Sequence, residues 1–209
     1  MRTILTLLIL FSISYSHAQT GFSAVKDEAV VRQKFTEIPQ KITAIKASFT
    51  QEKNLSALDD KLFSKGFFYF QKENKVRLEY IAPFKYIMIM NEGKMLIKDD
   101  AKSAKMDLRS NKIFQSVNRI MTDCVHGTAL TNPDFSTKVL ESTSQYKLEM
   151  TPTAKGMKEF FSVIYIFIDK NNYSPARLEL HEKSGDNTII SFANRELNKT
   201  LDAALFAVK

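Results

Sequence analysis

The fold is decided by residues 65–90, which read KGFFYFQKENKVRLEYIAPFKYIMIM. A sheet that buries one face alternates apolar and polar side chains with a period of two. The middle of the stretch follows this rule, since Val76, Leu78 and Tyr80 alternate with charged neighbours. The FFYF run near its start and the IMIM run at its end are instead apolar at every position. The stretch predicts antiparallel strands and a further layer that covers their apolar surface.

Short segments of this kind continue through most of the chain, separated by turn signals such as Asn91-Glu92-Gly93 and Ser184-Gly185-Asp186. About ten strands in one chain favour a barrel or a strongly curled antiparallel sheet. The expected strands are 47–53, 63–72, 75–81, 84–91, 94–98, 137–142, 146–151, 161–169, 176–182 and 188–194.

Helical spacing of apolar residues marks two longer segments. From residue 24 to 44 a helical stripe is expected, with apolar residues at steps of three and four: Val31, Phe35, Ile38, Ile42 and Ile45. Pro39 should kink or split this helix because proline lacks a backbone donor. A second amphipathic helix is expected over 110–125, closed by Gly127, with a short helix near 153–159. These helices either pack permanently on the sheet or form a movable cover.

The first eighteen residues have the pattern of a secretory signal. Arg2 precedes an apolar core over residues 3–13, and Ser16-His17-Ala18 forms a small-x-small cleavage site. We therefore expect 1–18 to be removed and 19–209 to form a single domain. No cysteine lies near the cut to accept a lipid anchor, and the sole cysteine, Cys124, has no partner for an internal disulfide. This usage favours the periplasm of a Gram-negative bacterium.

The net charge of +7 is a diffuse bias, because no run of five basic residues occurs. Exported basic proteins meet anionic lipid more readily than nucleic acid. We expect no nucleic-acid partner.

The sequence offers little catalytic chemistry. His126 and His181 have no partner at metal-ligand spacing, and neither a nucleophile elbow nor a phosphate loop occurs. The acid pairs Asp59-Asp60 and Asp99-Asp100 lie in expected turns, where aspartate bonds nearby backbone. We expect no enzyme, metal or cofactor, and a binding function instead, because a curled sheet with an apolar inner face could hold a lipid.

Several motifs in order resemble the LolA family of periplasmic lipoprotein carriers. They are Ala47-Ser48-Phe49-Thr50-Gln51, Gly66-Phe67-Phe68-Tyr69-Phe70, Val76-Arg77-Leu78-Glu79-Tyr80, Pro83, Asn91-Glu92-Gly93-Lys94 and Asp202-Ala203-Ala204-Leu205-Phe206. The resemblance implies an unclosed antiparallel β-barrel with a helical lid over a hydrophobic cavity. It also implies a monomer that accepts acylated lipoproteins from an inner-membrane ABC transporter and carries them to an outer-membrane acceptor that the sequence does not identify.

The resemblance places Val76 at an apolar cavity position, with Phe68, Phe70 and Leu78 as inward neighbours. Alternation along the expected strands extends this set. The candidate lipid-binding residues are Phe49, Phe68, Phe70, Val76, Leu78, Tyr80, Met88, Met90, Leu178 and Leu180.

One departure concerns the lid. The family often has Arg-Pro just after its second strand, where the arginine holds the lid shut, whereas this chain has Lys72-Glu73. Lysine lacks the planar fork of arginine, so the candidate latch residues are Lys72 and Arg77.

Four functions remain open. They are a lipoprotein carrier, a carrier of another lipid such as a glycolipid, a secreted lipid-ester hydrolase with His126 or His181 as base, and a structural β-domain whose apolar faces are all packed.

Overall fold

The computed structural model describes residues 21–58, 60–110 and 112–208, so the expected signal over 1–18 lies outside the described residues. One antiparallel sheet of twelve strands forms the body of the described chain. Its strands are β1 (Ser23–Ala24), β2 (Ala44–Leu55), β3 (Asp60–Gln71), β4 (Lys75–Ala82), β5 (Tyr86–Asn91), β6 (Lys94–Asp99), β7 (Ser103–Asp107), β8 (Phe135–Glu141), β9 (Gln145–Pro152), β10 (Phe161–Asp169), β11 (Pro175–Glu182) and β12 (Asn187–Leu197).

Six helical segments accompany the sheet within the described residues. They are α1 (Glu28–Glu37), η1 (Pro39–Lys41), η2 (Leu108–Ser110), α2 (Lys112–His126), α3 (Lys155–Lys158) and η3 (Ala203–Phe206), where η marks a 3₁₀ helix.

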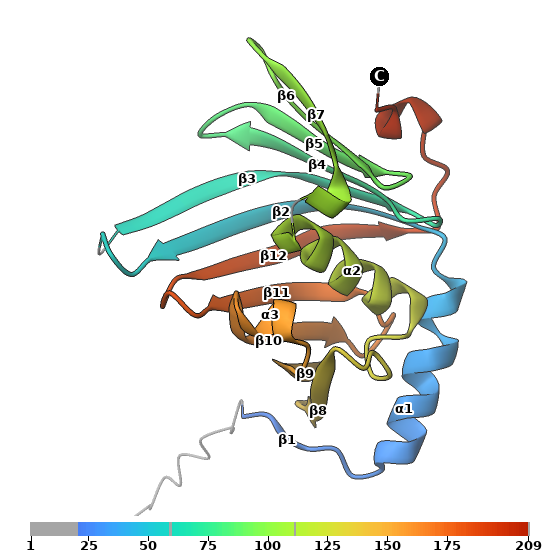
Figure 1. The fold of residues 1–209 in the computed structure, drawn as a ribbon. Helices are drawn as coiled ribbons and strands as arrows, with labels where there is room; N and C mark the ends of the chain where they lie inside the picture. The colour runs from blue at the N-terminus through green and yellow to red at the C-terminus, as the bar shows by residue number, and fades with distance from the viewer. Residues whose placement is uncertain (1–20, 59, 111, 209) are drawn as a thin grey trace, which may run out of the picture.

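The sheet curls but does not close. Its strand order is β1-β8-β9-β10-β11-β12-β2-β3-β4-β5-β6-β7, so β1 and β7 are the two edges. Figure 1 shows α2 lying across the face of the sheet in front of β12 and β11, with α1 at one end. We call the face covered by α2 the inner face and the opposite one the outer face. The predicted unclosed barrel with a few helices is confirmed.

Turn residues set the register where the sequence indicated. Asn91 pairs with Lys94, which leaves a two-residue turn of Glu92 and Gly93. Both have positive φ, 51° and 74°. Two consecutive left-handed residues match the right-handed twist of a hairpin, which explains the glycine here.

The first helix is shorter than predicted. Asp27 caps it by accepting a hydrogen bond from the Val30 N–H, and the helix ends at Glu37. Pro39 then starts the separate turn η1, because proline has no backbone N–H to continue the hydrogen bonds of the helix. Ile45, assigned to the helical stripe from its spacing, instead lies in β2 and pairs with Phe70.

Two edge strands were not predicted, and one strand begins later than expected. β7 is largely exposed and lacks an alternating apolar pattern, while β1 has only two residues. β5 starts at Tyr86, so Phe84 lies in the preceding turn with 77% of its surface exposed. The helix expected over 110–125 is confirmed as α2.

A close approach fixes α2 against α1. Gly127 follows α2 with φ of +75°, and a Cβ atom there would lie 2.4 Å from the Phe35 carbonyl oxygen. Only glycine tolerates both this conformation and this contact. The end of α2 is therefore anchored, while its first turns extend over the inner face (Figure 1).

Candidate functional site

The candidate lipid-binding residues all lie on the inner face. Nine are buried and Leu78 is partly buried. Strand pairing aligns them across the sheet: Val76 lies opposite Phe70 and Met90, and Leu78 lies opposite Phe68 and Met88. The sequence-based alternation therefore placed these residues on one continuous surface.

The apolar surface is wider than predicted. Sequence reasoning omitted residues that the same alternation on the expected strands would have found. The buried cluster also contains these omitted residues: Met95, Leu148, Met150, Ile164, Ile166, Ile190 and Phe192.

Tyr80 is the polar exception among the predicted inner residues. Its hydroxyl donates a 2.9 Å hydrogen bond to Gln51 Oε1, and its ring stacks on Tyr86 at 4.1 Å. Burial raises the pKa of this phenol well above its usual range. Tyr80 therefore stays neutral and belongs to the apolar lining.

The helix α2 completes the layer over this surface. Ile120, Met121 and Cys124 are buried in the same cluster as the inner strands. Burial also raises the pKa of the Cys124 thiol, so this free cysteine is a protonated packing residue and not a reactive one. The inner face is thus closed by apolar contacts between α2 and the sheet.

An ion pair links α2 to the segment that enters β8. Arg119 forms an ion pair with Asp134 at 2.7 Å, just before β8, and 54% of the arginine side chain is exposed. An exposed pair of this kind contributes only about 0.2–1 kcal/mol. The pair borders a pocket of about 270 Å³ between α2 and α3 that is also lined by Phe135 and Met157.

A second pocket, of about 280 Å³, lies between α2 and the β4–β6 region. Among its lining residues, Asn91, Asn118 and Thr122 carry a side-chain oxygen that is buried without a hydrogen-bond partner. Each such oxygen costs about 1–3 kcal/mol. The Asn91 side chain bonds Phe206 on the outer face, so it is separate from Asn118 and Thr122 on α2. The contact between α2 and the sheet is apolar at its centre.

The two predicted latch residues bind other segments. The Lys72 ammonium donates to the Gln40 carbonyl oxygen in η1. Arg77 donates to the Leu205 carbonyl oxygen at 3.2 Å and pairs with Glu79 at 2.8 Å. Their role as a latch stays a prediction, and the described ion pair of α2 is the one formed by Arg119.

The C-terminal segment covers part of the outer face, which resolves the question of the IMIM run. Phe206 in η3 is 1% exposed, and the outer-face residues Ile89 and Leu96 are also buried. η3 lies against β4 and β5, where the Asn91 amide donates to the Phe206 carbonyl oxygen at 3.0 Å. Asp202 caps η3 by accepting from the Ala204 N–H.

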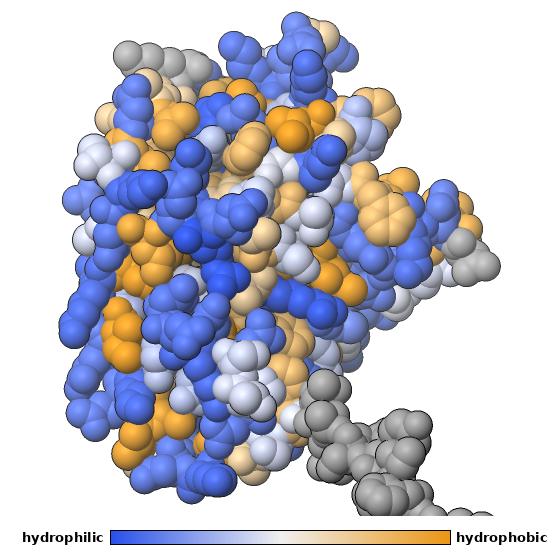
Figure 2. Space-filling view, turned by 180° about the vertical axis from the view of Figure 1, so that it is seen from behind, coloured by the Kyte–Doolittle hydropathy of each residue, from blue (hydrophilic) through white to orange (hydrophobic). Residues whose placement is uncertain are grey.

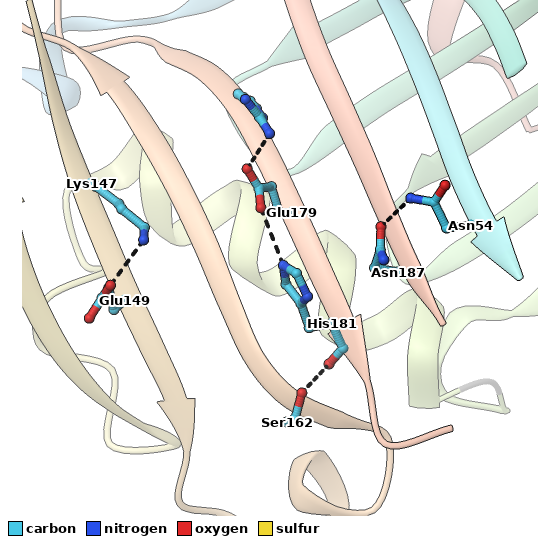
Figure 3. Close-up of polar contacts among 8 residues, drawn as sticks. Asn54, Lys147, Glu149, Ser162, Glu179, His181 and Asn187 are labelled. Carbon is cyan, nitrogen blue, oxygen red and sulfur yellow. Dashed lines mark hydrogen bonds and ion pairs between the residues drawn. The ribbon is translucent and has the colours of Figure 1, made fainter. Parts of the chain in front are cut away.

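Charged pairs organise much of the remaining outer face. Figure 3 shows Glu179 beside His181, at 3.2 Å between Oε2 and Nε2, and Lys147 bonded to Glu149 at 3.0 Å. Ser162 donates to the backbone carbonyl of His181 and not to its ring. These contacts belong to a row of polar and charged pairs along the outer face. They do not place the Ser162 hydroxyl against the His181 ring as a nucleophile and its base.

The other candidate chemistry has local explanations. The Asp99 carboxylate accepts from the N–H groups of Ala101 and Lys102, which lowers its pKa and fixes a turn, while Asp60 accepts from the Lys61 N–H. In residues 21–208, apart from 59 and 111, no group of three metal-ligating side chains occurs. No described helix is long and apolar enough to cross a membrane.

The outer face also carries an apolar groove of about 410 Å³ near the β2–β3 hairpin. Phe63, which lines it, is 62% exposed. Figure 2 shows this side as largely hydrophilic, with apolar residues scattered among charged ones. The outer face thus lacks the continuous apolar surface of the inner one.

Two unpaired sheet edges, an apolar inner face and a helix laid across that face are the features of a lipid-binding carrier fold. The chain belongs to the LolA family, because the family model described as "Outer membrane lipoprotein carrier protein LolA" matches residues 40–209. No curated protein matches the chain by sequence.

Solved structures show the same fold at low identity. The Pseudomonas aeruginosa MucA/MucB complex aligns with a TM-score of 0.52 and 12% identity, over 88% of this chain and 62% of that chain. An uncharacterized conserved protein from Thermus thermophilus gives 0.50 and 11%, over 88% and 95%. A LolA superfamily protein from Nitrosomonas europaea aligns with a TM-score of 0.45 and 9% identity, over 86% of this chain and 96% of that chain, which is too low to establish a shared fold.

Proposed function

We propose that this protein is a periplasmic carrier that shields the acyl chains of lipoproteins and moves them from the inner to the outer membrane. The observation that carries the proposal is the continuous apolar inner face beneath α2, because Ile120, Met121 and Cys124 of the helix pack into the same apolar cluster as the strands. Membership in the LolA family supports the same function.

The energetics favour an exchange of α2 for cargo. A chain of about 16 carbons gains roughly 12 kcal/mol on leaving water. Opening α2 breaks the exposed Arg119–Asp134 pair and exposes Ile120, Met121 and Cys124. Acyl chains then replace these apolar contacts on the strands, and the flexible methionines Met88 and Met90 can adapt to them. The carrier itself needs no catalytic group.

The function is tested by depletion in the source bacterium followed by separation of the two membranes. Lipoproteins destined for the outer membrane should accumulate in the inner membrane, and the wild-type gene should restore sorting. Correct sorting without the protein would refute a role as lipoprotein carrier. The donor is then expected to be an inner-membrane ABC transporter, which can be checked by crosslinking.

A carrier of another lipid, such as a glycolipid, is the second candidate. It is favoured by Lys72-Glu73 at the position of the family's Arg-Pro. Mass spectrometry of lipids that copurify with the exported protein separates the two cargoes. An apolar dye that found no site in the delipidated protein would favour a structural β-domain instead.

A further inference from the structure

The four most exposed large apolar side chains in the described part of the chain lie together at one end of the sheet. They are Leu58, Leu62, Phe63 and Phe84, and each exposes more than half of its surface. We call these four residues the apolar tip. Single exposed apolar residues are ordinary on protein surfaces, whereas a cluster of them marks an interaction surface. We propose that the apolar tip docks this protein on the surface of a lipid bilayer.

Two turns and the strand beside them bring the apolar tip together. Leu58 lies in the turn between β2 and β3, and Phe84 lies in the turn between β4 and β5. Phe63 of β3 lines the groove on the outer face together with Pro83, the residue before Phe84. Figure 1 shows both turns at the end of the sheet away from α1. The apolar tip is therefore one surface at that end.

The start of β3 extends beyond its neighbour β4. The last pair between these two strands joins Lys65 to Ala82, so within the described strands residues 60–64 pair only with β2. In this part Leu62 and Phe63 are adjacent and point to opposite faces of the sheet. A protein partner lying on one face would cover one of these two side chains and leave the other in water. The interfacial region of a bilayer would surround both, which favours lipid as the occupant.

Leu62 also connects the apolar tip to the inner face. It lies on the same side of β3 as Phe68 and Phe70, because side chains two positions apart in a strand share a face. An acyl chain that left a bilayer at the apolar tip would reach the inner face without crossing the charged outer one. The inference goes beyond the proposed carrier function, and docking itself requires only the apolar tip.

The charges around the apolar tip are mixed. Lys65 and Lys85 are exposed and form no ion pair with a described residue. Lys61 instead pairs with Glu52 at 2.8 Å, and Asp60 next to it is exposed. Free lysines can lay their alkyl stems along apolar surface and extend their ammonium groups to lipid phosphates. Docking should therefore depend mainly on apolar contact and less on the negative charge of the lipid.

The test measures how the mature protein binds vesicles in a flotation assay. One set of vesicles contains phosphatidylethanolamine with phosphatidylglycerol, and the other contains phosphatidylcholine alone. The variants are Phe63→Ser and Phe84→Ser. The matched control is Phe67→Ser, because Phe67 is an exposed phenylalanine on the same strand and the same face as Phe63 but lies opposite Glu79 in the paired part of β3.

Each tip variant should weaken binding to both kinds of vesicle about tenfold, because one aromatic ring no longer leaves water. Phe67→Ser should bind as the wild type does. Removal of phosphatidylglycerol should matter less than the loss of either phenylalanine. All three variants should bind a fluorescent fatty acid as the wild type does, since the inner-face residues are unchanged.

A fluorescent label reports which part of the molecule meets the bilayer. Cys124 is buried and its pKa is raised, so a thiol-reactive dye will label an introduced exposed cysteine selectively. An environment-sensitive dye at Leu58→Cys should shift its emission to the blue on vesicles. The same dye at Val30→Cys, on the exposed side of α1, should not shift. An unshifted dye at residue 58 would overturn the inference.

Three further results would also overturn it. Absence of wild-type binding to both kinds of vesicle would mean that the apolar tip requires a protein partner. Equal loss in Phe67→Ser would assign docking to the outer face as a whole. A wild-type dimer that either tip variant dissociates in gel filtration would assign the apolar tip to a second copy of the chain. Vesicle binding without any uptake of fatty acid is a separate result, since it retains the docking surface and refutes the carrier function.

Discussion

The side chains on the inner face of the sheet are held by apolar contacts, whereas many of those on the outer face are held by ion pairs. On β4, Val76 and Tyr80 enter the apolar cluster, whereas Arg77 and Glu79 between them form an ion pair on the other side. Apolar contacts are non-directional, so an acyl chain can replace α2 on the inner face without breaking a set of bonds. The pairs on the outer face have fixed geometry. A carrier can thus change what covers one face while the other keeps the sheet intact.

The largest effect is expected from a substitution that places a charge on the inner face. Val76→Glu should lower the free energy of unfolding by about 3–5 kcal/mol, because Val76 is 1% exposed and the new carboxylate has no partner. It should also abolish lipid binding. Urea unfolding and dye displacement measure the two effects.

Ile81→Glu is the matched control, since this residue of the same strand is 39% exposed. It should change stability by no more than about 0.5 kcal/mol. If Val76→Glu lost lipid binding but melted normally, the inner face would be an open cavity before cargo binds.

A substitution in the C-terminal segment that covers part of the outer face should lower the free energy of unfolding nearly as much. Phe206→Ala should cost about 3 kcal/mol, because it empties the buried site over β4 and β5. Leu205→Ala should cost much less, since Leu205 binds Arg77 through its backbone carbonyl. Equal losses in urea unfolding would contradict this account of how the segment is held.

Removal of the ion pair of α2 should have a smaller effect on stability but a clear effect on the rate of lipid uptake. Arg119→Ala should reduce stability by less than about 1 kcal/mol and speed the uptake of a fluorescent fatty acid, because it frees α2 from Asp134. Arg177→Ala removes an ion pair with Glu179 on the outer face and serves as the control. Stopped-flow uptake that was equally fast in both variants would argue against Arg119 as a latch.

The smallest expected effect is on the dependence of folding stability on pH in the acidic range. The ion pair with Lys170 lowers the pKa of Glu141 below 4.5, so the folded state binds this proton less readily than the unfolded state. The resulting stability is present above pH 4.5 and is lost as the pH falls through the lowered pKa. Glu141→Gln should flatten this part of the stability curve. An unchanged slope would show that the pair contributes nothing measurable.

Alternation in the sequence was enough to predict the inner face, because burial of one side of a strand leaves a period of two. It located Val76 and Phe68 correctly and could have located Ile164 and Ile166. The edge strand β7 escaped prediction because its residues are exposed and carry no such period.

Contacts between distant segments were beyond sequence patterns. The Arg119–Asp134 pair and the seating of Phe206 over β5 depend on how the sheet curls, which no local spacing encodes.

The position of β12 next to β2 has a consequence for how the chain is assembled. Strands β2–β7 and β8–β12 each pair with their neighbours in sequence, but the junction joins residues such as Asn54 and Asn187, which are 133 positions apart. Long-range pairing of this kind forms slowly. Until residue 197 is available, β2 keeps a bare edge at the future centre of the sheet. A chain truncated before β12 should therefore aggregate and not fold. Pairing of this last strand with β2 is then the event that completes folding of the sheet.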